Sequence, residues 1–331
     1  MIVRCPPPLV DFIHNYEFFF IVGHKEPDAD CVGSQFALAS LLRRLGKKTQ
    51  LCSAGPFKRF EILPFKDLFL TDAEKIRAEI KKAEENGQKS AVIIVDCSSP
   101  ERTGDIEKAF ESLPLAVIDH HATGKNNRGV LYVDASAPAC VVLIFFLFEE
   151  FGIEPDQEEA KALFLGLCTD TGFFRHLDSA AEEIFTLASS LVRAGASPKK
   201  TFGSINGGKS LDSRKLLGAI LSRAQLYFSG RLIISSEELA ETERYGLEGR
   251  DSDTLYQLFF AIKGVEAIAI IRQESQENCA VGLRSLDKLD VASVAAALGG
   301  GGHKNAAGFI RKGTIATLTQ DLITEFEKIL K

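Results

Sequence analysis

Continuous apolar runs alternate with amphipathic stretches along the first half of the chain. Residues 91–98 ("AVIIVDCS") and 115–121 ("LAVIDHH") open with unbroken apolar runs, which are typical of strands buried on both faces. Residues 18–24 ("FFFIVGH") predict a further strand. Residues 33–46 and 72–87 carry apolar side chains three and four positions apart and end in glycine, so they predict helices. Strands that alternate with helices predict a doubly wound, mainly parallel α/β sheet.

The pattern changes near residues 195–210, where glycine, serine, proline and asparagine predict a linker. Beyond it, "AQLYFSGRLIISS" and "VEAIAIIRQESQENCAVGLRS" predict two hairpins, and helical stretches surround them. This arrangement predicts a smaller C-terminal α/β domain with a mixed sheet. We therefore expect one domain over 1–194, a linker over 195–210 and a second domain over 211–331.

The composition is that of a soluble globular protein, because hydrophobic residues make up 45% of the 331 positions and charged residues 25%. The longest apolar run is shorter than the roughly 20 residues that cross a bilayer, and the N-terminus lacks the apolar core of a signal peptide. Seven scattered cysteines without a CxxC pair argue against a disulfide framework and a zinc ribbon. We expect a cytoplasmic protein with no membrane partner.

The net charge of −6 comes from the N-terminal part of the chain. Residues 201–331 hold 16 basic and 16 acidic side chains, which leaves 23 of the 39 basic and 29 of the 45 acidic ones in residues 1–200. Proteins that bind long nucleic acid usually carry a basic stripe, and the sequence has none. We therefore expect no long nucleic acid partner. If the acidic N-terminal part handles phosphates, it needs cations to offset the repulsion between the negative charges.

Histidine and aspartate residues follow three of the predicted strands, and a further aspartate ends a predicted helix. They are His24, Asp28, Asp30, Asp96, Asp119, His120, His121 and Asp170. Taken alone, each could cap a helix or turn or form an ordinary hydrogen bond. The carboxyl ends of parallel strands meet at one edge of the sheet, where ligands bind, so the whole set favours a metal site.

Six of these residues form a candidate ligand set: His24, Asp28, Asp30, Asp96, His120 and Asp170. Imidazole and carboxylate donors without thiolate suit Mn²⁺ or Mg²⁺ better than structural zinc. Six ligands are too many for one ion with an open position, but they fit two ions about 3.5–4 Å apart that share a carboxylate. We expect two divalent cations that activate a water for attack at phosphorus. Mn²⁺ is the expected metal, and Mg²⁺ is the alternative.

Four short stretches resemble the motifs of the DHH phosphoesterase superfamily, in the expected order. They are "HKEPDAD", "VDCS", "DHH" and "CTDTG", and "GLRS…GGGGHKNAAGF" resembles the DHHA1 domain that accompanies them. The size and layout resemble the subgroup of nanoRNases and pAp phosphatases, with RecJ-like and exopolyphosphatase-like relatives. The resemblance implies a DHH domain, a DHHA1 domain and an active site in the cleft between them.

The resemblance also implies roles for the matched residues. The first ion would bind His24 and Asp28, Asp96 would bridge, and the second ion would be completed by Asp30, His120 and Asp170. The catalytic group would contain a phosphate-facing histidine, an aspartate that orients a histidine, and an arginine near the active site: His121, Asp119 and Arg102.

The glycine-rich stretch at 299–302 predicts a phosphate cradle, because glycines let backbone N–H groups approach an anion closely. With the resemblance, it implies that the second domain binds the end of a short nucleotide chain. The residues expected to do so are Arg284, Ser285, Gly300, Gly301, Gly302 and His303. One departure concerns the segment 134–148, where family members often have a glutamate that this chain lacks, so substrate preference is open.

We expect a hydrolase that cleaves short oligonucleotides to mononucleotides and also acts on 3'-phosphoadenosine 5'-phosphate, with such short substrates as its partners. Cyclic or linear dinucleotides, and polyphosphate or pyrophosphate, are alternative substrates. A non-catalytic nucleotide sensor is the alternative from another class, which the complete ligand set disfavours. The sequence leaves a homodimer open.

Overall fold

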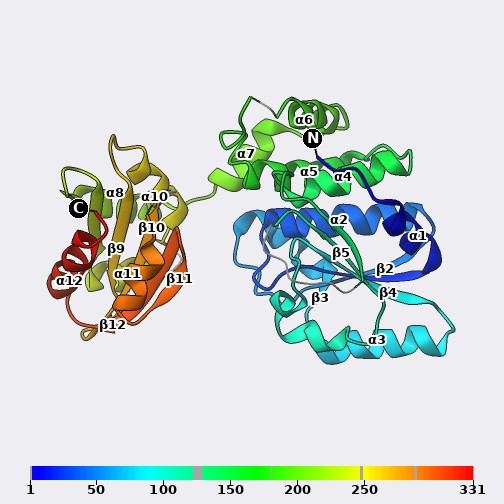
Figure 1. The fold of residues 1–331 in the computed structure, drawn as a ribbon, viewed down its shortest axis with the longest axis horizontal. Coiled ribbons are helices and arrows are strands. Elements are labelled where there is room, and N and C mark those ends of the chain that lie inside the picture. Colours follow the sequence, from blue (N-terminus) through cyan, green and yellow to red (C-terminus); the bar gives the residue numbers. More distant parts are fainter. Residues whose placement is uncertain (1, 122–128, 180, 247–248, 287–288, 331) are drawn as a thin grey trace. The chain divides into compact units, whose positions relative to one another are not determined.

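The computed structural model describes residues 2–121, 129–179, 181–246, 249–286 and 289–330 (Figure 1). The chain divides into two compact units, Met1–Gly207 and Gly208–Lys331, which are described separately below. The division falls inside the expected linker at 195–210. Much of that segment is helical, because α7 (Pro198–Asn206) begins after the cap Ser197. This helix contacts α5 (Gln157–Asp170) of the first unit.

The first unit contains a six-stranded parallel sheet in the order β3-β2-β1-β4-β5-β6, which confirms the predicted α/β class. Its strands are β1 (Phe18–Val22), β2 (Lys48–Cys52), β3 (Phe69–Leu70), β4 (Ser90–Val95), β5 (Leu115–Asp119) and β6 (Val130–Val133). Every residue of β1 and β4 is buried, as the unbroken apolar runs predict.

Helices cover both faces of this sheet (Figure 1). The unit contains α1 (Pro7–Asn15), α2 (Ala29–Arg44), η1 (Phe60–Leu68), α3 (Ala73–Glu85), η2 (Pro100–Ala109), α4 (Cys140–Glu150), α5 (Gln157–Asp170), α6 (Glu182–Arg193) and α7. Phe19 and Ile21 of β1 pack in the core with α2, α4 and α5, whereas Phe20 packs on the other side with Ile76 of α3.

Helix α2 begins four residues before the predicted start at residue 33, which is a correction to the sequence prediction. The Asp28 side chain accepts a hydrogen bond from Cys31 N at 3.0 Å and so caps the helix at Ala29. Ala29 and Val32 are fully buried, so this first turn is part of the core. The predicted helix at 72–87 matches α3, which Asp72 caps through Lys75 N.

The second unit contains a mixed sheet in the order β11-β12-β10-β9-β8-β7, in which only β8 and β9 among the described strands pair in parallel. The strands are β7 (Gln225–Tyr227), β8 (Leu232–Glu237), β9 (Ala267–Gln273), β10 (Asn278–Ser285), β11 (Gly301–His303) and β12 (Ala306–Lys312). Its helices are α8 (Leu211–Ser222), α9 (Leu239–Tyr245), α10 (Ser252–Phe260), α11 (Val291–Ala297) and α12 (Ile315–Glu327). The two predicted hairpins are β7–β8 and β9–β10.

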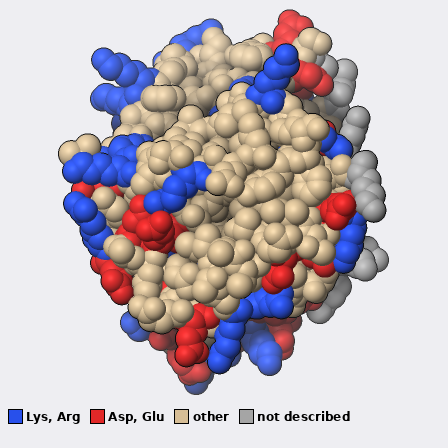
Figure 2. Space-filling model, turned by 90° about the vertical axis from the view of Figure 1, so that its left-hand side faces the viewer, with Lys and Arg blue, Asp and Glu red and all other residues tan. Residues whose placement is uncertain are grey.

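The surface shown in Figure 2 carries lysine and arginine interspersed with aspartate and glutamate around an area of other residues. On the described part of this surface, no continuous basic stripe crosses the view, in line with the balanced charge of residues 201–331. Among the residues that the structure describes, no helix is both long enough and apolar enough to span a bilayer.

Candidate active site

The strand ends of the first unit bring the predicted ligands to one edge of the sheet. Strands β1, β4 and β5 run parallel, and the residues that follow them include His24, Asp96 and His120. Asp28 and Asp30 stand at the start of α2, and Asp170 is the last residue of α5. They reach the same place because α2 packs closely along α5.

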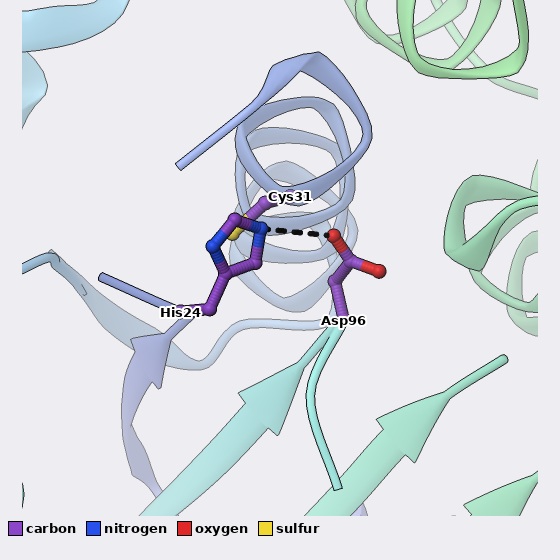
Figure 3. A group of neighbouring side chains, drawn as sticks. All are labelled: His24, Cys31 and Asp96. Atoms are coloured by element: carbon purple, nitrogen blue, oxygen red, sulfur yellow. Dashed lines mark ion pairs between the residues drawn. The ribbon is translucent and has the colours of Figure 1, made fainter. Parts of the chain in front are cut away.

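The Asp96 carboxylate lies between two histidines. Its Oδ2 is 3.5 Å from His24 Nε2 (Figure 3). The same His24 nitrogen is 3.8 Å from Asp28 Oδ1. Asp96 Oδ1 is 3.4 Å from His120 Nε2. The six predicted ligands therefore form two groups that share Asp96.

The second group is completed by Asp30 and Asp170. His120 Nε2 lies 3.6 Å from Asp30 Oδ2 and 3.5 Å from Asp170 Oδ2. These three residues offer one ligand atom each within 4.8 Å of one another, which is a spacing that a metal ion could bridge.

Two atoms at the centre of the cluster are buried without a hydrogen-bond partner in the described structure: Asp96 Oδ1 and His120 Nε2. The Asp96 side chain is 2% exposed. Unpaired polar atoms at such depth are costly, and several carboxylates without a cation repel one another. A cation beside Asp96 and His120 would satisfy both atoms, so the residues present fit divalent ions.

The backbone of Asp96 is strained in a way that serves the cluster. Its φ is +59°, in the left-handed region that residues with a side chain rarely adopt. Such strain persists where surrounding structure enforces it, often at functional sites. Here the turn directly after β4 holds the carboxylate between His24 and His120.

The fully buried Asp30 carboxylate is anchored by the start of α4. It accepts hydrogen bonds from Cys140 N at 2.5 Å and Val141 N at 2.9 Å. Burial raises the pKa of Asp30 well above its usual range, and the charges of Asp96 and Asp170 raise it further. Without a cation, Asp30 therefore keeps its proton to a higher pH than an exposed aspartate does.

The pKa values of Asp170 and Asp28 shift in opposite directions. Burial, with the charges of Asp28 and Asp96, raises the pKa of Asp170 to about 7. Burial alone would raise the pKa of Asp28, but His24, the Cys31 N–H and the Arg59 charge lower it to about 2. Burial lowers the pKa of His120, but Asp96 and Asp30 outweigh it and raise the value to about 9.

Asp119 orients His121 and not His120. His121 Nδ1 lies 2.8 Å from Asp119 Oδ1, and the Ser98 hydroxyl donates to the other oxygen of the same carboxylate. His120 Nδ1 instead lies 3.2 Å from the carbonyl oxygen of Ala137. With Nδ1 held, the half-exposed His121 can turn Nε2 toward a substrate.

Arg102 lies in η2, beside the loop that carries His24. Its carbonyl oxygen accepts a hydrogen bond from Lys25 N at 2.7 Å. The Arg102 side chain is exposed and makes no ion pair with the described residues.

In the second unit, the structure brings Arg284 and His303 onto one face of the sheet. Both lie directly opposite Ala306, Arg284 from β10 and His303 from β11, so their side chains point the same way. The Arg284 guanidinium lies over the Tyr256 ring, 4.8 Å from its centroid. Ser285 points to the opposite face, where its hydroxyl donates to Leu289 O at 2.8 Å.

The glycine run forms the start of an edge strand. A Cβ at Gly300 would lie 2.2 Å from Gly308 O, and one at Gly302 would lie 2.5 Å from Ala306 O. Gly301 has open space around it. Glycine at 300 and 302 therefore lets this segment approach β12, and Gly301–His303 remain exposed.

Both units match known domain families. Residues 19–167 match the DHH family, N-terminal domain, and residues 235–331 match the DHHA1 domain. The first unit therefore contains a DHH N-terminal domain, and the second contains a DHHA1 domain. The matched ranges include the first three motifs and the glycine-rich stretch, and "CTDTG" at 168–172 directly follows the first range.

Curated relatives match nearly the whole DHH–DHHA1 chain. A Thermus thermophilus protein named bifunctional oligoribonuclease and PAP phosphatase NrnA is 27% identical over 313 residues, 94% of this chain and 88% of that protein. A Bacillus subtilis protein of the same name is 25% identical and covers 91% of each chain. An exopolyphosphatase-related protein from Bacteroides fragilis has the same fold, with a TM-score of 0.83 at 21% identity over 97% of this chain and 96% of that one.

Two residues beside the candidate metal ligands of the DHH domain, here called the DHH centre, are not among the site residues predicted from the sequence. Ser98 lies in "VDCS", two positions after Asp96, and its bond to Asp119 depends on the pairing of β4 with β5. Cys31 follows Asp30, and its buried Sγ lies within 4.8 Å of ligand atoms of His24 and Asp96 (Figure 3). Burial raises the pKa of the Cys31 thiol to about 12, and all seven cysteines are buried and free.

Proposed function

We propose that the protein is a metal-dependent phosphoesterase that hydrolyses short oligonucleotides to mononucleotides and also acts on 3'-phosphoadenosine 5'-phosphate. The observation that carries the proposal is the double cluster of histidine and aspartate around Asp96, with its two unpartnered buried atoms. The names of full-length relatives, oligoribonuclease and PAP phosphatase, support the substrate class.

The residues that would hold two divalent cations fall into the two groups around Asp96. They are His24, Asp28 and Asp96 in one group, and Asp30, Asp96, His120 and Asp170 in the other. When bound, such ions lower the pKa of water and offset charge on a phosphoryl group. Two imidazoles among the donors favour Mn²⁺ over Mg²⁺.

The remaining residues of the DHH centre would act on the substrate itself. His121, held by Asp119, faces the scissile phosphate and moves a proton at Nε2. Asp119 and Ser98 position that ring. Arg102 binds a non-bridging phosphate oxygen from the edge of the cluster.

In the DHHA1 domain, Arg284 and His303 would bind the phosphate or base at the far end of a short chain. Their shared face and the exposed backbone of Gly300, Gly301 and Gly302 support this assignment. Ser285 would position the turn that follows β11, because Asn305 Nδ2 donates to its hydroxyl at 3.1 Å.

A second candidate function is hydrolysis of cyclic dinucleotides in preference to linear ones. A Listeria monocytogenes protein named cyclic-di-AMP phosphodiesterase PdeA is 25% identical over 341 residues, although this chain covers only 49% of it. We also propose a cytoplasmic location, where seven free thiols stay reduced.

A substrate panel tests both functions. Purified protein with Mn²⁺, with Mg²⁺ or with chelator is given an RNA dinucleotide, a 24-nucleotide RNA, 3'-phosphoadenosine 5'-phosphate, cyclic di-AMP and polyphosphate, and the products are separated by chromatography. The proposal expects metal-dependent release of mononucleotides from the dinucleotide, well above the rate on the long RNA. Faster cleavage of cyclic di-AMP would favour the second candidate. No metal-dependent product from any short substrate would refute both.

A further inference from the structure

We propose that Arg59 and Phe60 form a nucleotide-binding element beside the His24–Asp28 half of the centre. In this element the Arg59 guanidinium binds a substrate phosphate and the Phe60 ring stacks on a base. The inference rests on the proposed function and adds to it a contact site on the DHH domain, separate from Arg284 and His303.

The segment that carries these two residues lies against the loop of the metal centre. Glu26 N donates to Gly55 O at 2.9 Å, and Lys58 Nζ lies 2.7 Å from Glu26 Oε1. Glu26 stands between His24 and Asp28 in the sequence. Residues 55–60 therefore run beside the loop that positions both ligands.

Among the cations at this edge, Arg59 has its charge available for a ligand. Lys58 is paired with Glu26, and Lys25 lies 3.6 Å from Asp105. Arg59 is exposed and makes no ion pair with any residue that the structure describes. A phosphate that approaches an acidic cluster is drawn to such a cation.

Phe60 is 62% exposed, so the hydrophobic core does not account for it. The neighbours that anchor the segment are different residues: Ile62 is fully buried, and the buried Phe57 ring lies 5.2 Å from Phe69. An anchored backbone thus presents an aromatic ring next to a guanidinium. Proteins commonly bind single-stranded nucleotides with this pair, through base stacking and phosphate contact.

An exposed phenylalanine by itself is ordinary on a protein surface. The assignment depends on three features together: the aromatic ring, the adjacent unpaired cation and the position beside His24 and Asp28. The experiment must therefore distinguish base stacking from a general effect on folding.

Isothermal titration calorimetry with AMP and with inorganic phosphate, in the presence of Mn²⁺, makes that distinction. The variants are Phe60→Leu, Phe60→Tyr and Arg59→Ala in the full chain. Matched controls in η1, the helix that Phe60 begins, are Lys66→Ala, which removes an exposed cation, and Leu68→Ala, which removes a 49% exposed apolar side chain. The kcat and KM for an RNA dinucleotide are measured in parallel.

We expect Phe60→Leu to weaken AMP binding about fivefold or more and to leave phosphate binding unchanged, because only the base stacks. Phe60→Tyr should keep the wild-type affinity for AMP, and Arg59→Ala should weaken the binding of both AMP and inorganic phosphate. The effect on the dinucleotide falls mainly on KM, and both controls behave as wild type.

If the wild-type protein hydrolyses the dinucleotide while Phe60→Leu and Arg59→Ala bind AMP as wild type does, the inference is overturned and the proposed function stands. An equal loss in Phe60→Leu and Phe60→Tyr also overturns it, because the ring is then structural. A wild-type protein that hydrolyses no short substrate refutes the proposed function, and the inference with it.

Discussion

At the scale of single residues, Asp96 explains why the site has two halves. Each of its carboxylate oxygens faces one histidine, Oδ2 toward His24 and Oδ1 toward His120. The sequence predicted the residue types at this edge, because they follow apolar strands. It left open which histidine Asp119 orients, since adjacent residues at a strand end can turn either way.

The two adjacent histidines should respond differently to substitution. His120 faces three carboxylates, whereas His121 is held by Asp119. His120→Ala should therefore lose about one of two bound Mn²⁺ ions, and His121→Ala should keep both ions and lose kcat by about 10²–10⁴-fold. Metal analysis by mass spectrometry and steady-state kinetics check this. Equal loss of metal in both variants would contradict the division of roles.

The raised pKa values make metal binding depend on pH. Asp30 and Asp170 bind protons more tightly in the folded than in the unfolded chain, so between pH 4 and the folded value of about 7 for Asp170 these groups make the apoprotein less stable as pH rises. To bind Mn²⁺, Asp30, Asp170 and His120 would have to lose these protons. The increase in Tm on adding Mn²⁺ should be larger at pH 7.5 than at pH 5.5, as thermal unfolding would measure. A larger increase at pH 5.5 would contradict it.

At the scale of elements, the centre depends on close packing of α2, α4 and α5. The start of α4 donates two backbone N–H groups to Asp30, and α5 passes Asp30 at a glycine, Gly166. The sequence predicted α2 and a helix that ends at Asp170, but it placed the start of α2 too late. Asp28 is both the cap of α2 and a candidate metal ligand. From the local sequence alone, these two roles were alternatives, so the start of the helix at Ala29 was not predicted.

Gly166→Ala should disturb both packing and metal binding. The added Cβ would lie 2.7 Å from Val141 Cγ1 and 3.0 Å from Asp30 Oδ1. We expect a loss of about 1–3 kcal/mol in the free energy of unfolding, with weaker Mn²⁺ binding. Gly218→Ala, in α8 with open space around it, is the matched control and should be neutral or stabilising by up to about 1 kcal/mol. Denaturant unfolding with and without Mn²⁺ checks both, and unchanged Mn²⁺ affinity in Gly166→Ala would count against the packing argument.

At the scale of the whole molecule, all six candidate metal ligands lie in the first unit, whereas Arg284 and His303 lie in the second. The sequence predicted two α/β domains and the position of the change between them. It could not show that Arg284 and His303 share a face, because that depends on the register of β10, β12 and β11.

This separation predicts a variant that keeps its metals but binds substrate poorly. Replacing Arg284 and His303 together by alanine should raise the KM for an RNA dinucleotide about tenfold or more, since it removes two ligand contacts. Mn²⁺ binding should stay as in the wild type. Lys312→Ala, which removes an exposed charge from β12, is the control. A lower Mn²⁺ content in the double variant, or an unchanged KM, would contradict the separation.

Electron paramagnetic resonance of bound Mn²⁺ tests most directly whether Asp96 joins two metal sites. The wild-type protein should take up two Mn²⁺ ions per chain, and their signals should show magnetic coupling through a shared ligand. Asp96→Asn should lose that coupling and most of its activity on an RNA dinucleotide. A wild-type protein that binds a single Mn²⁺, or two ions whose signals are independent, would contradict the shared centre.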